Sequence, residues 1–378
     1  MKKNVTGPEN AIKIEKGVPL KNSLNRETIA HDAMMIQSVY PDFLVDEFVD
    51  ATVDDSWEAL ELMERGRKVT DGLVKYLPTN YEEALRIIDQ IVDQYALEIA
   101  VIGLSFPDYV TIRGLEEEHF ALSVKALEKY TTFWSSEFAV RPFIIKDEDQ
   151  MMNQMYQWSK HGNEHVRRLS SEGCRPQLPW AQSLPAFKKD PTPIFPILEQ
   201  LKTDSSQYVR KSVANNLNDI SKTHPQLVTK IAMEWYGKNN HTDWIIKHGC
   251  RTLLKKGNRE VLNLFGYHDA EIDVSDLSVD RNVITIGEDL TFSFLITVKE
   301  ATKLRVEFAI DYVKANGKNS RKIFQISESS ATKNTTKEYR KKHSFANVST
   351  RKHYPGIHAF TLIVNGVEKG TIPFKLNE

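Results

Sequence analysis

Three short segments decide the fold of most of this chain: NEHVRRLSSEG (163–173), SQYVRKSVANN (206–216) and TDWIIKHGCRT (242–252). They align without gaps, and the apolar residues Val166, Val209 and Ile245 fall at one shared position, 43 and 36 residues apart. That spacing is near the roughly 40–47 residues typical of two-helix HEAT or armadillo repeats. Because such repeats stack and bury one face against their neighbours, we predict a helical solenoid with a long concave surface.

The sequence on either side of these segments falls into two patterns. Between residues 19 and 267 apolar side chains recur every three or four positions, which is typical of amphipathic helices. From Ile272 the period changes to two, with alternation over 283–296 and 304–310 and further short strands around 321–327, 358–364 and 370–374. We therefore predict an all-α helical-repeat domain over 19–267 and a small all-β sandwich over 268–378, preceded by an N-terminal tail (1–18).

Composition limits the class of protein. The chain has 378 residues, of which 40% are hydrophobic and 27% charged, and this fits a globular protein with a sizeable core. Two cysteines, Cys174 and Cys250, are too few for a disulfide framework or a cysteine-rich zinc site. There is no run of about 18 apolar residues and no apolar stretch at the N-terminus. We therefore expect a reduced, cytoplasmic setting with no membrane partner.

Charge is segregated along the chain although the formal net charge is only −1. Residues 1–158 carry 16 basic and 28 acidic groups, whereas residues 159–260 carry 17 and 9. Within the β-rich part, residues 314–352 hold 11 basic groups against two acidic ones. Two basic zones in a nearly neutral protein indicate a polyanionic partner that meets part of the surface. The alternative is that these charges only solvate surface faces.

One basic residue occupies the same position in each aligned segment: Arg168, Lys211 and Lys247. On a stacked array these side chains would form a ladder along one face, which suits a phosphate backbone better than a small ligand. Three unrelated solvated residues would give the same pattern, so the alternative stays open.

Two carboxylates and a tryptophan lie where the helical pattern does not require them. Glu172 comes directly before Gly173 in the last turn of a predicted helix, and Asp219 lies near the end of the next repeat. An acid near a helix C-terminus is unfavourable by roughly 0.3–1 kcal/mol, and such local inconsistencies are expected at working sites. Trp180 ends the proline-bounded segment RPQLPW (175–180), and an aromatic ring with a free face there would favour binding of a flat cation. A plain surface ion pair between Arg168 and Glu172 is the alternative for that carboxylate.

Other kinds of active site find no support in the sequence. There is no P-loop, no dinucleotide-binding glycine fingerprint, no HExxH pair and no GxSxG elbow. His161 and His165 are four residues apart, but Gly162 and Asn163 between them indicate a helix break. We therefore expect neither a cofactor nor a metal.

Several longer segments resemble one family. TTFWSSEFAVRPFI (131–144), HVRRLSSEGCRPQLPWA (165–181), VRKSVANNLNDISKTHP (209–225) and WIIKHGCRTLLKKG (244–257) look like the AlkC branch of the HEAT-like DNA alkylation-repair glycosylases. PLKNSLNRETI (19–29) is similar too, so the resemblance covers about residues 19–267. The β-rich part resembles the immunoglobulin-like extension that some members of this branch carry.

The resemblance implies a fold, a reaction and a set of residues. It implies HEAT-like repeats with an immunoglobulin-like sandwich, and hydrolysis of the N-glycosidic bond of small cationic lesions, chiefly 3-methyladenine, in duplex DNA. Glu137, Glu172 and Asp219 would be active-site carboxylates and Trp180 an aromatic wall. Glu137 has a second interpretation as an N-terminal helix acid after Ser135 and Ser136.

DNA contact is assigned to both domains. For the helical part the resemblance implies that Arg168 and Arg175 hold backbone phosphates around the lesion, and we assign DNA contact to Lys211, Lys247 and Arg251 as well. In the β-rich part we assign it to Lys341 and Lys342, which we expect in a loop at one end of the sandwich that contacts the minor groove of DNA. The predicted partner is double-stranded DNA containing alkylated bases, bound by a monomer associated with the nucleoid. The competing hypothesis is a non-catalytic HEAT-repeat scaffold that binds DNA or protein.

Overall fold

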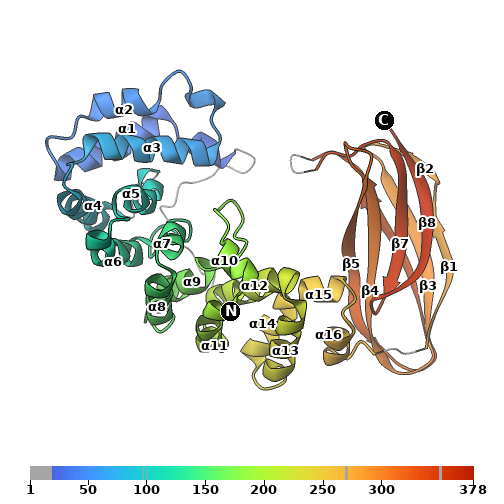
Figure 1. Ribbon diagram of the computed structural model, residues 1–378. Coiled ribbons are helices and arrows are strands. Elements are labelled where there is room, and N and C mark those ends of the chain that lie inside the picture. The colour runs from blue at the N-terminus through green and yellow to red at the C-terminus, as the bar shows by residue number, and fades with distance from the viewer. Residues whose placement is uncertain (1–18, 97, 100, 269–270, 349–350) are drawn as a thin grey trace, which may run out of the picture. The chain divides into compact units, whose positions relative to one another are not determined.

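The computed structural model describes residues 19–96, 98–99, 101–268, 271–348 and 351–378, and the predicted tail over 1–18 lies outside them. The chain divides into two compact units, one ending at Thr223 and the other beginning at His224 (Figure 1). The first unit is helical throughout. The second contains the last helices together with all the strands of the described chain.

The first unit is a series of short helices joined by tight turns, as the helical period predicts. Its α-helices are α1 (Arg26–Val39), α2 (Val45–Thr52), α3 (Leu62–Tyr76), α4 (Tyr81–Tyr95), α5 (Phe106–Arg113), α6 (Phe120–Tyr130), α7 (Val140–Lys146), α8 (Glu148–Trp158), α9 (Glu164–Glu172), α10 (Pro185–Lys189), α11 (Phe195–Leu201) and α12 (Gln207–Thr223). Successive helices pack as neighbours, including α7 on α8, α8 on α9 and α9 on α12. The predicted helical-repeat solenoid is therefore confirmed.

The packing of α9 against α12 is fixed by both apolar and polar contacts. Val166 and Val209, which share one position in the aligned segments, are completely buried. The hydroxyls of Ser171 and Ser212 are 2.7 Å apart, and the amide of Asn216 donates to the Ser171 carbonyl at 2.8 Å. Because these polar bonds are buried and have specific geometry, they fix the register of the two helices.

The second unit begins with four helices and continues into a β-sandwich. The helices are α13 (Pro225–Trp235), α14 (Asn240–Gly249), α15 (Arg251–Lys255) and α16 (Arg259–Leu264). The strands are β1 (Ile272–Val279), β2 (Val283–Thr285), β3 (Asp289–Val298), β4 (Thr302–Val313), β5 (Asn319–Ala331), β6 (Thr335–Ser344), β7 (Gly356–Val364) and β8 (Val367–Asn377). Three form a sheet in the order β1-β3-β6 and five a sheet in the order β2-β8-β7-β4-β5, so the predicted sandwich is confirmed.

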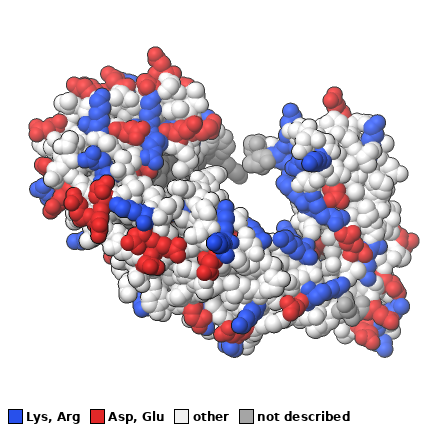
Figure 2. Space-filling model, viewed as in Figure 1, with Lys and Arg blue, Asp and Glu red and all other residues white. Residues whose placement is uncertain are grey.

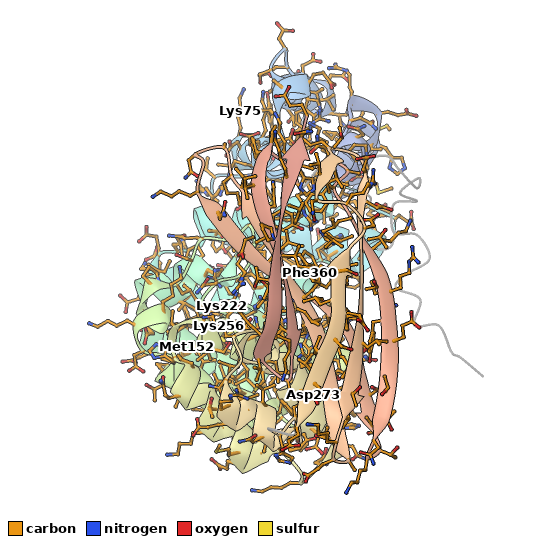
Figure 3. All side chains as sticks on the ribbon, turned by 90° about the vertical axis from the view of Figure 1, so that its right-hand side faces the viewer. Lys75, Met152, Lys222, Lys256, Asp273 and Phe360 are labelled. Carbon is orange, nitrogen blue, oxygen red and sulfur yellow. The ribbon has the colours of Figure 1, made fainter. Side chains whose placement is uncertain are left out.

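The sandwich core follows from the alternating pattern. Every second residue of β3 is buried, including Phe292 and Phe294, because side chains along a strand point alternately to its two faces. Phe360 of β7, labelled in Figure 3, is completely buried. Its ring lies against that of Phe292, with ring centroids 4.5 Å apart. The two sheets therefore enclose one aromatic-rich core.

The expectation that Lys341 and Lys342 lie in a loop is wrong. Both lie in β6, where Lys341 pairs with Phe292 and Lys342 with Thr291 of β3. The sequence signal for a strand is weak there because β6 is an edge strand with a solvated face, so charged residues replace the apolar alternation. Exposed Arg321 and Lys322 lie in β5, the edge strand of the other sheet, where Figure 2 shows basic side chains gathered.

Among the described residues, no helix combines the length and the apolar character that crossing a bilayer requires.

Candidate active site

The residues predicted for catalysis converge where α7, α9 and α12 meet in the first unit. Glu172 is the last residue of α9, Asp219 lies on α12 five residues after a completely buried alanine, and Glu137 lies just before α7. Glu172 and Asp219 are 5% and 1% exposed. We call these three acids, with Arg168 and Arg175, the carboxylate cluster.

Arginines alternate with the acids in this cluster. Arg168 forms an ion pair with Glu137 and lies 3.6 Å from Glu172. Arg175 donates from Nη1 to Glu172 at 2.6 Å and from Nε to Asp219 at 2.8 Å. The side chain of Arg175 thus holds carboxylates of two different helices at one point.

The ion pair between Arg168 and Glu172 exists, but it is not a plain surface pair. The Arg168 side chain is 15% exposed and that of Glu172 is 7% exposed. Each acid near a helix C-terminus also has a compensating cation, because Lys222 donates to Asp219 at 2.8 Å. The adverse helix-dipole interaction is therefore offset by neighbouring positive charges.

Trp180 differs from the other tryptophans of this unit. It is 82% exposed and has φ of 65°, a left-handed backbone conformation that is uncommon for a bulky residue. By contrast, Trp57 and Trp158 are 1% exposed. The loop from 173 to 182 therefore presents an aromatic ring to solvent beside the end of α9.

Arg141 holds this loop and was missed by the sequence reasoning. Its completely buried guanidinium donates to the carbonyls of Gly173 and Arg175 at 2.8 Å each, and to that of Gln182 at 2.5 Å. Burial lowers the pKa of Arg141 to about 10, so the side chain keeps its charge at neutral pH. The sequence did offer one signal for this role, since Arg141 is a single cation within the otherwise apolar run VRPFII (140–145) of α7.

Tyr208 of α12 is a second residue that the sequence reasoning missed. The Arg168 guanidinium lies over its ring, 5.0 Å from the centroid. Arg168 also donates to the Ser135 hydroxyl at 2.9 Å, and that hydroxyl in turn donates to Glu137 at 2.6 Å. Arg168 is therefore oriented by a ring, a hydroxyl and two acids.

The other residues assigned to DNA are distributed over both units. Lys211 is exposed on α12, and Arg251 donates to the His248 carbonyl at 2.8 Å. Lys247 of α14 is paired with Glu328 of β5 at 2.5 Å. On β6, Lys341 is exposed and Lys342 is paired with Asp289 at 2.8 Å.

Two family models match the chain. The model described as DNA alkylation repair enzyme matches residues 63–253, and the one described as the C-terminal Ig-like domain of the uncharacterised protein YhaZ matches residues 273–378. The second match agrees with the expected immunoglobulin-like character of the sandwich.

Two relatives match nearly the whole chain. The uncharacterized protein YhaZ of Bacillus subtilis (strain 168) is 49% identical over 358 residues, covering 94% of this chain and 99% of its own. The structure of Pseudomonas fluorescens alkylpurine DNA glycosylase AlkC, bound to DNA containing an abasic site analog, is 37% identical with a TM-score of 0.90. That match covers 96% of this chain and 100% of the other.

Proposed function

This chain belongs to the DNA alkylation repair enzyme family, and from that premise we propose that it is a monofunctional DNA N-glycosylase acting on cationic alkylated bases. The proposed substrate is chiefly 3-methyladenine in duplex DNA, released as the first step of base excision repair. One observation carries the proposal: Arg175 joins Glu172 and Asp219 at the start of the loop that exposes Trp180.

The chemistry of a cationic base fits the carboxylate cluster. Such a base already carries positive charge, so it leaves the sugar without a general acid. The remaining needs are stabilisation of an oxocarbenium-like sugar and delivery of a water molecule. Glu137, Glu172 and Asp219 supply negative charge for the first, and one of them orients or deprotonates the water.

Selectivity for cations follows from the same groups. The exposed ring of Trp180 attracts a positively charged base by cation–π interaction, typically about 0.5–2 kcal/mol. Neutral lesions such as hypoxanthine lack this attraction and are poor leaving groups, so we expect them to be spared. The lesion is approached from the helical surface without full flipping into an enclosing pocket, unlike in many base-modifying enzymes.

Arg168 and Arg175 are proposed to hold phosphates around the lesion. In the free protein both are paired with acids of the carboxylate cluster. A phosphate would compete for these guanidinium groups, since arginine binds phosphate and carboxylate with the same fork of donors. DNA binding would then leave the acids less neutralised, and so better able to stabilise the sugar cation.

The same proposal covers the roles of the two domains, the other DNA contacts, the oligomeric state and the location of the protein. Residues 19–267 form the catalytic DNA-binding domain and residues 268–378 a second DNA contact. Lys211 and Arg251 contact the backbone from the helical part, and Lys341 and Lys342 from β6. The protein acts as a monomer on nucleoid DNA in the cytoplasm. Support comes from AlkC, which matches 96% of this chain and is a DNA-bound glycosylase.

The test is release of the base and its dependence on two acids. Wild type, Glu172→Gln and Asp219→Asn are incubated with methylated duplex DNA, and the free base is identified by chromatography. We expect each variant to release 3-methyladenine at least about 100-fold more slowly, because a charge at the transition state is lost. Affinity for a duplex with an abasic-site analogue should change only a few-fold.

Glu199→Gln is the matched control, because Glu199 is an exposed acid of α11 paired with Lys202 outside the carboxylate cluster. It should release base at the wild-type rate. A wild-type protein that binds the duplex but frees no base would replace the glycosylase with the scaffold hypothesis.

A further inference from the structure

The turn between β7 and β8 packs directly on the last helices of the second unit. Gly366 in this turn and Gly257 between α15 and α16 both have positive φ, 75° and 69°. A Cβ added to Gly257 would lie 3.1 Å from the Gly366 carbonyl oxygen, and one added to Gly366 would lie 2.5 Å from Leu262 Cδ1. The two backbones are therefore in close contact, and a side chain at Gly366 would displace Leu262.

Asn365 ties the same turn to the end of the helical segment. It is 2% exposed, and its Oδ1 accepts from the Arg305 backbone N–H at 2.8 Å. Its Nδ2 donates to the carbonyl of Lys303 at 3.0 Å and to that of His268 at 3.3 Å. The buried Asn365 amide thus links β4, the β7–β8 turn and His268, which lies between α16 and the first strand.

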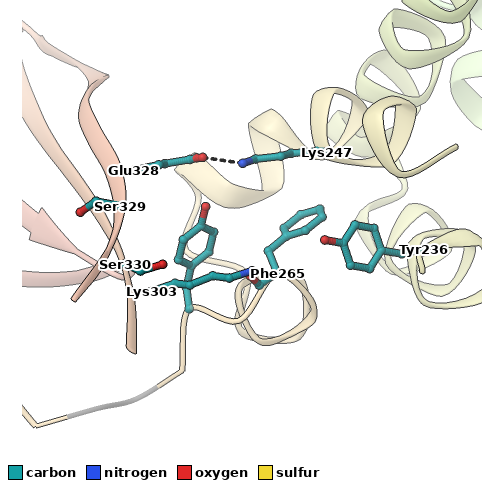
Figure 4. A pocket seen from close by; sticks show the side chains of 8 residues that line it. Tyr236, Lys247, Phe265, Lys303, Glu328, Ser329 and Ser330 are labelled. Atoms are coloured by element: carbon teal, nitrogen blue, oxygen red, sulfur yellow. Dashed lines mark hydrogen bonds and ion pairs between the residues drawn. The ribbon is translucent and has the colours of Figure 1, made fainter. Parts of the chain in front are cut away.

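Charged groups complete this contact (Figure 4). Lys247 of α14 pairs with Glu328 of β5 at 2.5 Å, and Glu328 also pairs with Arg305. Arg305, which is 3% exposed, donates to Glu307 at 2.6 Å. Lys303 Nζ donates to the Phe265 carbonyl at 3.1 Å, beside a pocket of about 260 Å³.

The balance of interactions at Glu328 favours its charged form. Burial opposes ionisation of this carboxyl, but the hydrogen bond and the charge of Lys247, together with Arg305, outweigh burial and lower its pKa. The lysine and the acid therefore form an ion pair between a helix and a strand at neutral pH. We call Lys247, Arg305, Glu328, Asn365 and Gly366 the joint.

We propose that the joint is a positioning device, which holds the sandwich on α13–α16 so that its basic edge strands are presented to DNA in one fixed orientation. This proposal rests on the proposed function. Lys247 then acts through Glu328 and not by contacting a phosphate. The direct phosphate contact predicted from the repeat pattern is the competing role for the same side chain.

Neutral substitutions separate the two roles of Lys247, because Glu328 also pairs with the buried Arg305 and a lysine at position 328 would repel it. Lys247→Met, Glu328→Gln and the double variant are compared for Kd on a duplex with an abasic-site analogue, and for base release under single-turnover conditions. The joint predicts that each single variant raises Kd by about fivefold and that the double variant is no weaker than the weaker single variant, since both changes break the same ion pair. Saturating release rates should stay unchanged.

The phosphate contact predicts a different order. Glu328→Gln would then tighten binding, because it frees Lys247 for the phosphate, and only the variants that lack Lys247 would bind more weakly. Tighter binding by Glu328→Gln overturns the joint. If wild type binds DNA but releases no base, the proposed glycosylase fails while the Kd comparison still tests the joint.

A second variant tests the joint without changing any charge. Gly366→Ala should raise Kd and increase amide exchange of the β7–β8 turn, because the added methyl collides with Leu262. Gly317→Ala is the matched control, since Gly317 also follows an asparagine in a hairpin, has φ of 74° and has open space around it. Equal effects of the two substitutions on Kd would contradict the joint, because strain alone would explain them.

Discussion

The carboxylate cluster and the joint are built from the same residue types but have different surroundings. In each, an arginine bonds two carboxylates: Arg175 bonds Glu172 and Asp219, and Arg305 bonds Glu307 and Glu328. The arginines and their partners are largely buried in both places. Chains of alternating charge are therefore not by themselves a mark of a reactive site in this protein.

What differs is the backbone next to each chain of charges. The joint is closed by the Asn365 amide and by two glycines in contact, so its ion pairs connect packed elements. The carboxylate cluster adjoins a loop with an 82% exposed tryptophan in a left-handed conformation, held from beneath by a buried arginine. We infer that the neighbouring loop, more than the ion pairs, distinguishes the site.

Among the changes that test this contrast between the carboxylate cluster and the joint, the largest effect is expected from removing Arg141, the arginine that holds the loop. Arg141→Met leaves the buried carbonyls of Gly173 and Arg175 without their donor, each costing about 1–3 kcal/mol, and removes the bond to the partly buried Gln182 carbonyl, so the loop should lose its defined conformation. We expect single-turnover release of 3-methyladenine to fall by at least about tenfold. If release stays at the wild-type rate, the loop is not the feature that distinguishes the carboxylate cluster from the joint.

A double-mutant cycle with Trp180→Ala shows whether Arg141 acts through the loop. Arg141→Met should add little to the loss already caused by Trp180→Ala, because the two changes remove one shared feature. Fully additive losses would contradict this coupling. Arg167→Met is the control for stability, since Arg167 also donates to two carbonyls and an acid but lies away from the loop.

A smaller effect is expected on the stability of the sandwich when the pH is lowered. Burial, followed by the charge of Arg351, lowers the pKa of His343 to about 4, and burial lowers the pKa of His353 and His358 as well. Between pH 6.5 and about 4 the unfolded chain binds protons that the folded sandwich does not, so stability falls as pH falls through this window. The loss should be on the order of 1–3 kcal/mol.

Thermal melting of wild type and His343→Gln across this range measures the effect. The variant should depend less on pH, whereas His268→Gln, which changes an exposed side chain, should follow wild type. A pH dependence that is the same in all three proteins would show that the buried histidine does not cause it.

The smallest effect is expected at the two cysteines, one in each unit. Burial raises the pKa of both Cys174 and Cys250 to about 12, so both thiols stay protonated at pH 8 and out of reach of reagents. Neither should react with iodoacetamide in the native protein, as followed by mass spectrometry. Rapid labelling of Cys174 alone would show that the region beside the loop opens locally, which would sharpen the contrast with the joint.

Much of the fold was accessible from the sequence because it depends on local periodicity. Val166, Val209 and Ile245 share one repeat position and are all completely buried. The alternation over 290–296 is the buried face of β3, whereas in β2 the expected alternation is out of phase, since Ile284 is buried and Val283 and Thr285 are exposed. The strand β6 was missed because a solvated edge strand does not need apolar alternation.

The site was only partly accessible. Glu172, Asp219 and Trp180 were noticed because each violates a local rule, an acid at a helix end or a large ring in a proline-bounded loop. Glu137 came from family resemblance alone. Arg141 and Tyr208 were missed because their roles depend on partners 32 and 40 residues away, Gly173 and Arg168.

The sequence by itself determined where helices give way to strands, which faces are buried and which acids sit unfavourably on their helices. These features depend on neighbours within one turn or one strand, so a pattern along the chain is sufficient to reveal them. Only the tertiary structure decided that Arg175 joins two acids, that Arg141 supports the Trp180 loop and that Lys247 pairs with Glu328. Such contacts join residues far apart in the chain, and a guanidinium or an amine gives no sequence signal of which carboxylate or carbonyl it will meet.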